Sequence, residues 1–163
     1  MSDGHRWLSD TEQESWKTFQ LMQMQLNAAL NRQLARDSGI SLADYSVLVA
    51  LTEERDGRMR AYELGGALGW EKSRLSHHVT RMANRGLVDR DGCPSDRRGA
   101  YVVVTEKGRE AIRAAAPGHV DAVRARFVDL LTAEQLEAMG TIAGVVLREL
   151  AGECDPLEEP AGA

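Results

Sequence analysis

The stretch from residue 61 to 105 is the part of the sequence that most constrains the fold. Its first segment, AYELGGAL, predicts a short helix with Leu64 and Leu68 one turn apart. A second helical segment, EKSRLSHHVTRMAN, follows, and Gly86 is placed to end it. Two β-prone runs, LVDRD and AYVVVT, then flank the turn-rich residues GCPSDRRG. Short helix, tight turn, second helix and hairpin is the order of a winged helix-turn-helix.

The second of these helices has two unlike faces. Leu75, Val79 and Met82 form a narrow apolar stripe at helical spacing, and His78 leans toward it, which predicts a structural role for His78. The opposite face is polar, basic and free of carboxylates: Ser73, Arg74, His77, Thr80, Arg81 and Asn84. Short polar side chains can approach base edges in a major groove, while Arg neutralises phosphates. The alternative is that this face is only an ordinary solvent-exposed surface. Such a surface would be expected to carry some acidic residues, because the chain has 25 acidic and 20 basic residues.

Charge is unevenly distributed along the chain. The formal net charge is −5, which by itself argues against bulk affinity for nucleic acid. Between Arg58 and Arg98, however, nine basic residues face five acidic ones, so this middle region carries +4 and the remainder −9. The basic region coincides with the predicted helix-turn-helix.

Long helices flank this region. Ser9 and Glu12 form a capping box that opens a helix to Asp37, and Ser41 caps a short buried helix. After the hairpin, Thr105 caps a helix that Pro117-Gly118 should kink or interrupt, and a box of Thr132 and Gln135 opens the last one. We therefore expect one domain over residues 1–163, mainly α with a small β-hairpin (an α+β fold), and a flexible tail over 153–163.

The segment GLVDRDGCPSDRRGAYVVVTEKG, from Gly86 to Gly108, resembles the wing signature of the MarR family of bacterial transcriptional regulators. The resemblance implies a homodimer in which helices over 9–37 and 106–152 form a dimerisation lobe and 41–105 forms the winged helix-turn-helix lobe. It also implies that the dimer binds double-stranded DNA at a pseudo-palindromic operator, with a recognition helix in each major groove, most often as a repressor.

The same resemblance assigns roles to individual residues. Base and phosphate contacts from the recognition helix map onto Ser73, Arg74, Ser76, His77, Thr80 and Arg81. In the wing, Arg98 would enter the minor groove with Asp96 holding it, and Arg97 would contact a phosphate. Residues two apart on an extended chain point the same way, which fits the pairing of Asp96 with Arg98.

A small aromatic or amphipathic effector is a further implication of the family. Trp16, Phe19 and Met22, at helical spacing on the first helix, are candidate pocket residues. Burial against a second copy of the chain is the other interpretation of the same residues. The sequence does not identify the ligand.

Other functional classes find little support. The chain has no run of about 18 apolar residues and no signal-peptide pattern, so we expect a cytoplasmic protein without a membrane segment. No metal-ligand spacing, P-loop, Rossmann glycine pattern or catalytic triad order is present, so we expect no cofactor, no metal and no enzymatic activity.

Cys93 leaves redox sensing open. A winged-helix module that binds protein instead of DNA is the remaining alternative.

Overall fold

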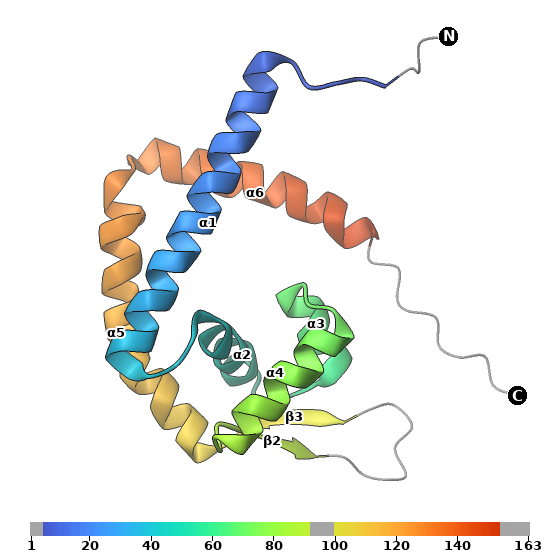
Figure 1. Ribbon diagram of the computed structural model, residues 1–163, viewed down its shortest axis with the longest axis vertical. Coiled ribbons are helices and arrows are strands. Elements are labelled where there is room, and N and C mark those ends of the chain that lie inside the picture. The colour runs from blue at the N-terminus through green and yellow to red at the C-terminus, as the bar shows by residue number, and fades with distance from the viewer. Residues whose placement is uncertain (1–4, 92–99, 154–163) are drawn as a thin grey trace, which may run out of the picture. The chain divides into compact units, whose positions relative to one another are not determined.

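The computed structural model of the chain describes residues 5–91 and 100–153 (Figure 1). Within these residues the fold is mainly helical, with a small antiparallel sheet, as the sequence predicts. In chain order the elements are α1 (Asp10–Ser38), α2 (Leu42–Glu53), β1 (Arg58–Arg60), α3 (Ala61–Leu68), α4 (Lys72–Asn84), β2 (Val88–Asp91), β3 (Tyr101–Val104), α5 (Glu106–Arg126), the 3-10 helix η1 (Val128–Leu130) and α6 (Ala133–Glu153).

The chain forms two compact units, residues 1–122 and 123–163, with the boundary inside α5. The first unit holds α1 to α4, the sheet and most of α5. The second holds the end of α5, η1 and α6. Most of the predicted tail, 154–163, lies outside the described residues, while Glu153 ends α6.

Local hydrogen bonds set the helix ends where the sequence predicts them. The Ser9–Glu12 capping box opens α1, and Gly39, with φ 64°, ends it. A second box between Ser41 and Asp44 opens α2. At the start of α6, Thr132 and Gln135 exchange backbone-to-side-chain hydrogen bonds of 2.9 and 3.3 Å.

The sheet has the order β1-β3-β2, and both pairs are antiparallel. Val88 pairs with Val104 and Arg90 with Val102, so these four residues share one face of the sheet. Val88, Val102 and Val104 are buried on that face. The strand β1 was not predicted: three residues, two of them arginines, carry no periodic signal, and their pairing with β3 is non-local.

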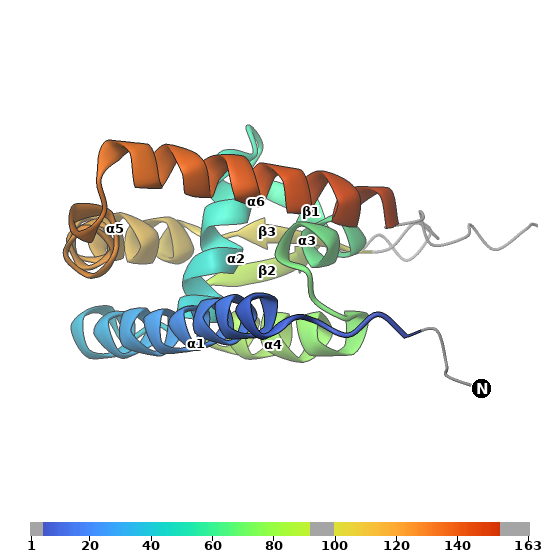
Figure 2. The same cartoon turned by 90° about the horizontal axis from the view of Figure 1, so that it is seen from above.

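The core of the first unit forms where α2, α3, α4 and the apolar face of the sheet meet the C-terminal end of α1. Leu34, Leu48, Leu51, Leu64 and Met82 are fully buried there. Gly65 of α3 packs closely on the α3–α4 turn, because a Cβ there would lie 3.2 Å from the carbonyl oxygen of Trp70. In both views α4 lies beside β2, at the outside of the unit (Figures 1 and 2).

Interruption of the helix at Pro117, one of the two outcomes that the sequence allowed, does not occur. The helix α5 continues through Pro117 to Arg126. A proline inside a helix costs about 3 kcal/mol, so packing on both sides of it must outweigh that loss. Ala115 before Pro117 is buried, and the ring of His119 after it packs on Tyr45 at 4.4 Å.

Among the described residues, no single helix is long and apolar enough to cross a membrane, although Glu106–Leu130 and Ala133–Ala151 reach that length and composition when taken as one bent pair.

Candidate nucleic-acid interface

The exposed face of α4 carries the six residues that the sequence assigns to the recognition helix. Ser73, Arg74, Ser76, His77, Thr80 and Arg81 are all exposed. On the opposite side, Leu75, Val79 and Met82 are buried in the core, at 4%, 2% and 0% exposure. The predicted division of the helix is therefore present, and its polar face lies on the surface of the unit.

Arg90 extends this face from the neighbouring strand. Its Nη2 donates to the Ser76 carbonyl oxygen at 2.8 Å and to Thr80 Oγ1 at 3.0 Å. Thr80 Oγ1 in turn donates to the Ser76 carbonyl at 2.8 Å, as serine and threonine hydroxyls do in helices. One guanidinium thus holds the middle of the α4 face.

Arg90 was not among the residues predicted from the sequence, although strand alternation indicates its position. Val88 is buried against the helices, and Arg90 lies two residues on, so both point to the same face of the sheet. The Arg90 side chain therefore extends from this face of the sheet to α4.

Arg74 lies against an aromatic ring at the start of α4. Its guanidinium carbon is 4.5 Å from the centroid of the Trp70 ring, within the range of a cation–π interaction. Trp70 also packs edge-on against His78, with ring centroids 5.1 Å apart. This contact gives the Arg74 side chain a preferred position on the exposed face.

His78 is buried at 7% exposure and connects α4 to α2, which agrees with the structural role predicted for it. Its Nε2 lies 3.0 Å from Asp44 Oδ1, and its Nδ1 lies 2.9 Å from Arg81 Nη2. Arg85, at the C-terminal end of α4, donates from Nη1 to Asp44 Oδ2 at 2.7 Å and from Nη2 to the Gly39 carbonyl at 2.8 Å. One buried carboxylate therefore anchors both the middle and the end of α4.

Asp44 is held ionised by these partners. Burial by itself raises the pKa of this carboxyl, but the contacts from His78, Ser41 and Arg85 lower it well below its usual range. A buried carboxylate with partners on both oxygens is costly to leave unpaired. No local pattern predicts the contacts of Asp44 with His78 and Arg85, because both residues are far from Asp44 along the chain.

A threonine and two glycines fix the junction of α4, the hairpin and α5. Gly86, with φ 73°, ends α4 in the left-handed conformation. Thr105 Oγ1 donates to the Gly86 carbonyl at 2.7 Å and accepts from the Gly108 amide at 3.0 Å, which caps α5 as predicted. A side chain at Gly108 would collide with the Leu87 carbonyl. These contacts explain why the wing signature needs glycine, threonine and glycine at these positions.

The described base of the hairpin adds further cationic groups. Arg58 and Arg60 of β1 lie over the ring of Tyr101 in β3, with guanidinium carbons 4.7 and 4.5 Å from its centroid. The wing residues named by the sequence, Asp96, Arg97 and Arg98, lie outside the described residues, as does Cys93. Their roles remain predictions.

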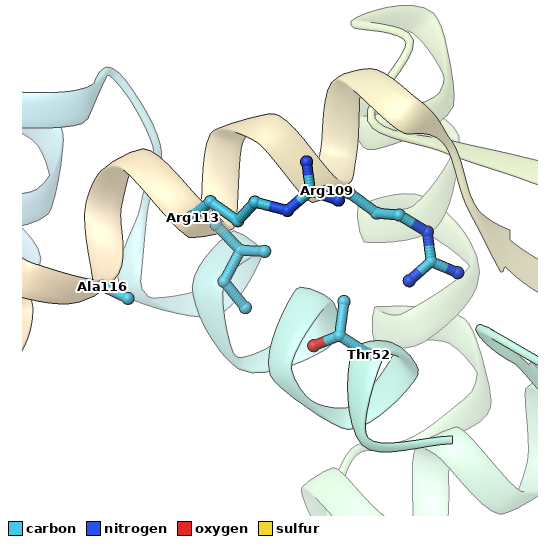
Figure 3. A pocket seen from close by; sticks show the side chains of 5 residues that line it. Thr52, Arg109, Arg113 and Ala116 are labelled. Carbon is cyan, nitrogen blue, oxygen red and sulfur yellow. The ribbon is translucent and has the colours of Figure 1, made fainter. Parts of the chain in front are cut away.

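The effector candidates lie on the exposed part of α1. Trp16, Phe19 and Met22 are 51%, 44% and 39% exposed, and the rings of Trp16 and Phe19 stack at 6.0 Å. None of the three lines a pocket of about 280 Å³ between α2 and α5. That pocket is lined by Thr52, Arg109, Ile112, Arg113 and Ala116, and Figure 3 shows the two arginines on α5 beside Thr52 on α2.

Within residues 5–91 and 100–153, no group of three or more His, Cys, Asp or Glu side chains is arranged to hold a metal ion.

Comparison with known proteins gives consistent matches. The MarR family model matches residues 38–99. The solved structure of AbsC, a MarR family transcriptional regulator from Streptomyces coelicolor, is 42% identical and superposes with a TM-score of 0.82, over 91% of this chain and 99% of AbsC. Sco3205 from the same organism, a MarR family regulator solved in complex with DNA, is 40% identical, with a TM-score of 0.83 over 94% of this chain and 97% of its own. The transcriptional repressor MprA of Escherichia coli K12 is 27% identical over 90% of this chain and 81% of its own length.

Proposed function

This chain belongs to the MarR family of DNA-binding transcriptional regulators, and we propose that it reads its operator through the exposed face of α4. The family matches favour a DNA-binding regulator over a winged-helix module that binds only protein. In this proposal Ser73, Ser76, His77 and Thr80 face the base edges, and Arg74 and Arg81 contact phosphates or bases at the rim.

The observation that carries the proposal is the exposed, carboxylate-free surface of α4 from Ser73 to Asn84. The side chains on it are short hydrogen-bonding groups and arginines, the types that read base edges and neutralise phosphates. Arg90 holds Thr80 in place, and Trp70 holds Arg74, through the contacts described above. A surface with its side chains already positioned loses less conformational entropy on binding.

The wing makes the second contact of the proposal. Arg98 would probe the minor groove with Asp96 beside it, and Arg97 would contact a phosphate, as the family resemblance implies. Arg58 and Arg60 at the hairpin base add positive charge near the same end of the sheet. We expect Arg98→Ala to weaken operator binding without unfolding the protein.

A second copy of the chain is the proposed partner of α1. The exposed side chains of Trp16, Phe19 and Met22 support this assignment, since apolar residues gathered on one helix mark an interaction surface. A symmetric dimer would present two α4 helices to half-sites about one helical turn, roughly 10 base pairs, apart. Action as a repressor and a location in the cytoplasm complete the proposal and rest on the family resemblance.

A small effector with an acidic group would suit the pocket between α2 and α5. Arg109 and Arg113 supply positive charge there, while Ile112 and Ala116 supply an apolar wall. A ligand regulates only if its affinity differs between the DNA-binding state and the released state. The pocket is thus an alternative to Trp16, Phe19 and Met22 as an effector site.

Selection of bound duplexes from a random-sequence pool tests the DNA-reading proposal. We expect an enriched palindrome whose affinity falls linearly with salt on a double logarithmic plot, with a slope of about −0.9 for each phosphate contacted. A pool without enrichment, or an affinity that does not change with salt, would contradict the proposal.

A further inference from the structure

The Thr80 hydroxyl, on the exposed face of α4, makes two hydrogen bonds whose directions follow from the chemistry of the partners. Its Oγ1 lies 2.8 Å from the Ser76 carbonyl oxygen and 3.0 Å from Arg90 Nη2. A carbonyl oxygen can only accept a hydrogen bond, and a guanidinium can only donate one. The Thr80 hydroxyl therefore donates its proton to Ser76 and uses one lone pair to accept from Arg90.

These two bonds leave the Thr80 hydroxyl with a single hydrogen-bonding position. A hydroxyl has one proton and two lone pairs, so the position that is left is a lone pair, which can only accept. Thr80 is exposed on the surface of α4, so this lone pair is available to a donor from another molecule. A binding partner must therefore offer Thr80 an N–H or O–H group.

Arg90 determines which way the Thr80 side chain points. A threonine in a helix divides between two χ1 rotamers. Arg90 stabilises the rotamer in which Oγ1 faces the Ser76 carbonyl, because its Nη2 donates to both oxygens, at 2.8 Å to the carbonyl and 3.0 Å to Oγ1. Donation by Thr80 to another molecule would cost the hydroxyl its bond with Ser76. The acceptor character of Thr80 thus depends on an arginine of β2.

The major groove of DNA offers such a donor at every base pair. Each pair exposes one amino group there, on adenine or cytosine, and one carbonyl oxygen, on thymine or guanine. We propose that Thr80 accepts a hydrogen bond from the amino group of adenine or cytosine, and that Arg90 is the positioning residue that gives Thr80 this preference. The inference rests on the proposed function, because it names the base group that the same surface reads.

Selection of duplexes from a random-sequence pool locates the base pair that Thr80 contacts. Thr80→Val keeps the branched shape of threonine without its hydroxyl, so it should lose the preference for adenine or cytosine at one position in each half-site. Thr141→Val is the matched control on α6, where Thr141 Oγ1 donates to the Glu137 carbonyl at 3.0 Å in the same way. Its selected duplexes should be those of the wild type.

Base analogues then separate the amino group from the carbonyl oxygen at that base pair. Sequence preference cannot do so, because adenine or cytosine on one strand always faces thymine or guanine on the other. Purine in place of adenine, or 2-pyrimidinone in place of cytosine, removes the amino group. A second duplex lacks the carbonyl oxygen, through 5-methyl-2-pyrimidinone in place of thymine or 2-aminopurine in place of guanine.

The measured quantity is the loss of affinity that each analogue causes in the wild type, divided by the loss that it causes in Thr80→Val. This quotient cancels any change in the duplex itself. For the amino group we expect a quotient of about three to ten, as the loss of one hydrogen bond implies. For the carbonyl oxygen we expect a quotient near one. Thr80→Ser keeps the hydroxyl and should behave as the wild type.

Arg90→Met tests the positioning role, because it removes the donor and keeps a long side chain. The amino-group quotient should fall below about two in this variant, and Arg90→Lys, which retains a donor, should restore part of it. Arg126→Met removes an equal charge from an exposed position on α5 and should leave the quotient unchanged. Thermal unfolding checks that each variant is folded. If Arg90→Met weakened binding to all duplexes by one factor and kept the quotient, Arg90 would not position Thr80.

Three results would overturn the inference while leaving operator binding intact. They are an unchanged base preference in Thr80→Val, an amino-group quotient of one, and a carbonyl quotient well above one. A random pool from which the wild type enriches no sequence would instead contradict the proposed function, and the inference would fall with it.

Discussion

The region around α4 and the exposed part of α1 use their apolar side chains in opposite ways. Leu48, Leu64 and Met82, around α4, are fully buried by their own chain. Trp16 and Phe19 on α1 remain 51% and 44% exposed. The helix-turn-helix region thus completes its core within one chain, whereas α1 carries exposed apolar side chains, which is why we propose a partner for it. Rigidity at α4 suits base readout, and exposure on α1 suits association.

The largest expected effect tests whether the α4 region is self-sufficient. Leu75→Ala should lower the free energy of unfolding by about 2 to 5 kcal/mol, because it leaves a cavity beneath α4. Denaturant unfolding measures this loss. The matched truncation Leu147→Ala, at a residue that is 63% exposed on α6, should act only through association and therefore depend on protein concentration. If both variants lost the same free energy of unfolding at every protein concentration, the α4 region would not differ from the exposed apolar surface in this respect.

A slightly smaller loss of free energy of unfolding is expected when the buried carboxylate of Asp44, which binds α4, is removed. Asp44→Asn should cost about 2 to 4 kcal/mol at pH 7, less than a fully buried pair would, because the Arg85 side chain is 44% exposed. In the folded protein the pKa of Asp44 is lowered from an ordinary value of 3.8, so the carboxylate stabilises the fold above that pH. Its contribution is lost as the pH falls below 3.8 toward the folded-state pKa.

Unfolding curves of the wild type and Asp44→Asn across pH provide the measurement. The difference in free energy of unfolding between the two proteins should stay constant from pH 8 down to about pH 5. It should become smaller below the pH range in which ordinary carboxyl groups titrate. A difference that grew on acidification would mean that Asp44 does not bind its partners in the ionised form.

The α1 surface is tested by a change that leaves the core alone. Phe19→Asp should weaken self-association by about 2 kcal/mol, which is on the order of thirtyfold in the dissociation constant. Sedimentation equilibrium measures this change. Gln25→Asp adds the same charge to α1 away from Phe19 and should have little effect. Phe19→Asp with wild-type association would mean that α1 is not the interface.

Features governed by neighbouring residues were predictable from the sequence. The Ser9–Glu12 box, the glycine that ends α4 and the cap at Thr105 involve groups close along the chain or a recurrent signature. The apolar and polar faces of α4 followed from helical spacing alone.

Features that depend on distant residues were not predictable in the same way. The contacts of Arg90 with Thr80 and of Arg85 with Asp44 join separate elements, and β1 exists only because β3 pairs with it. The continuity of α5 through Pro117 likewise depends on packing that no local pattern encodes. Helical spacing identified the apolar residues of α1, but it cannot say whether a protein surface or a ligand covers them.

The base preference of His77→Ala tests most directly the central claim, that the exposed face of α4 reads base edges. His77 is suited to this test because it is exposed in the middle of that face and has no role in the core. Duplexes are selected from a random pool by the wild type and by this variant under the same conditions. The account predicts that preference changes at one base pair in each half-site, with a loss of about 1 to 3 kcal/mol of discrimination there, while all other positions are unchanged. Identical preferences with uniformly weaker binding would contradict the account, since His77 would then contact only the backbone of the duplex.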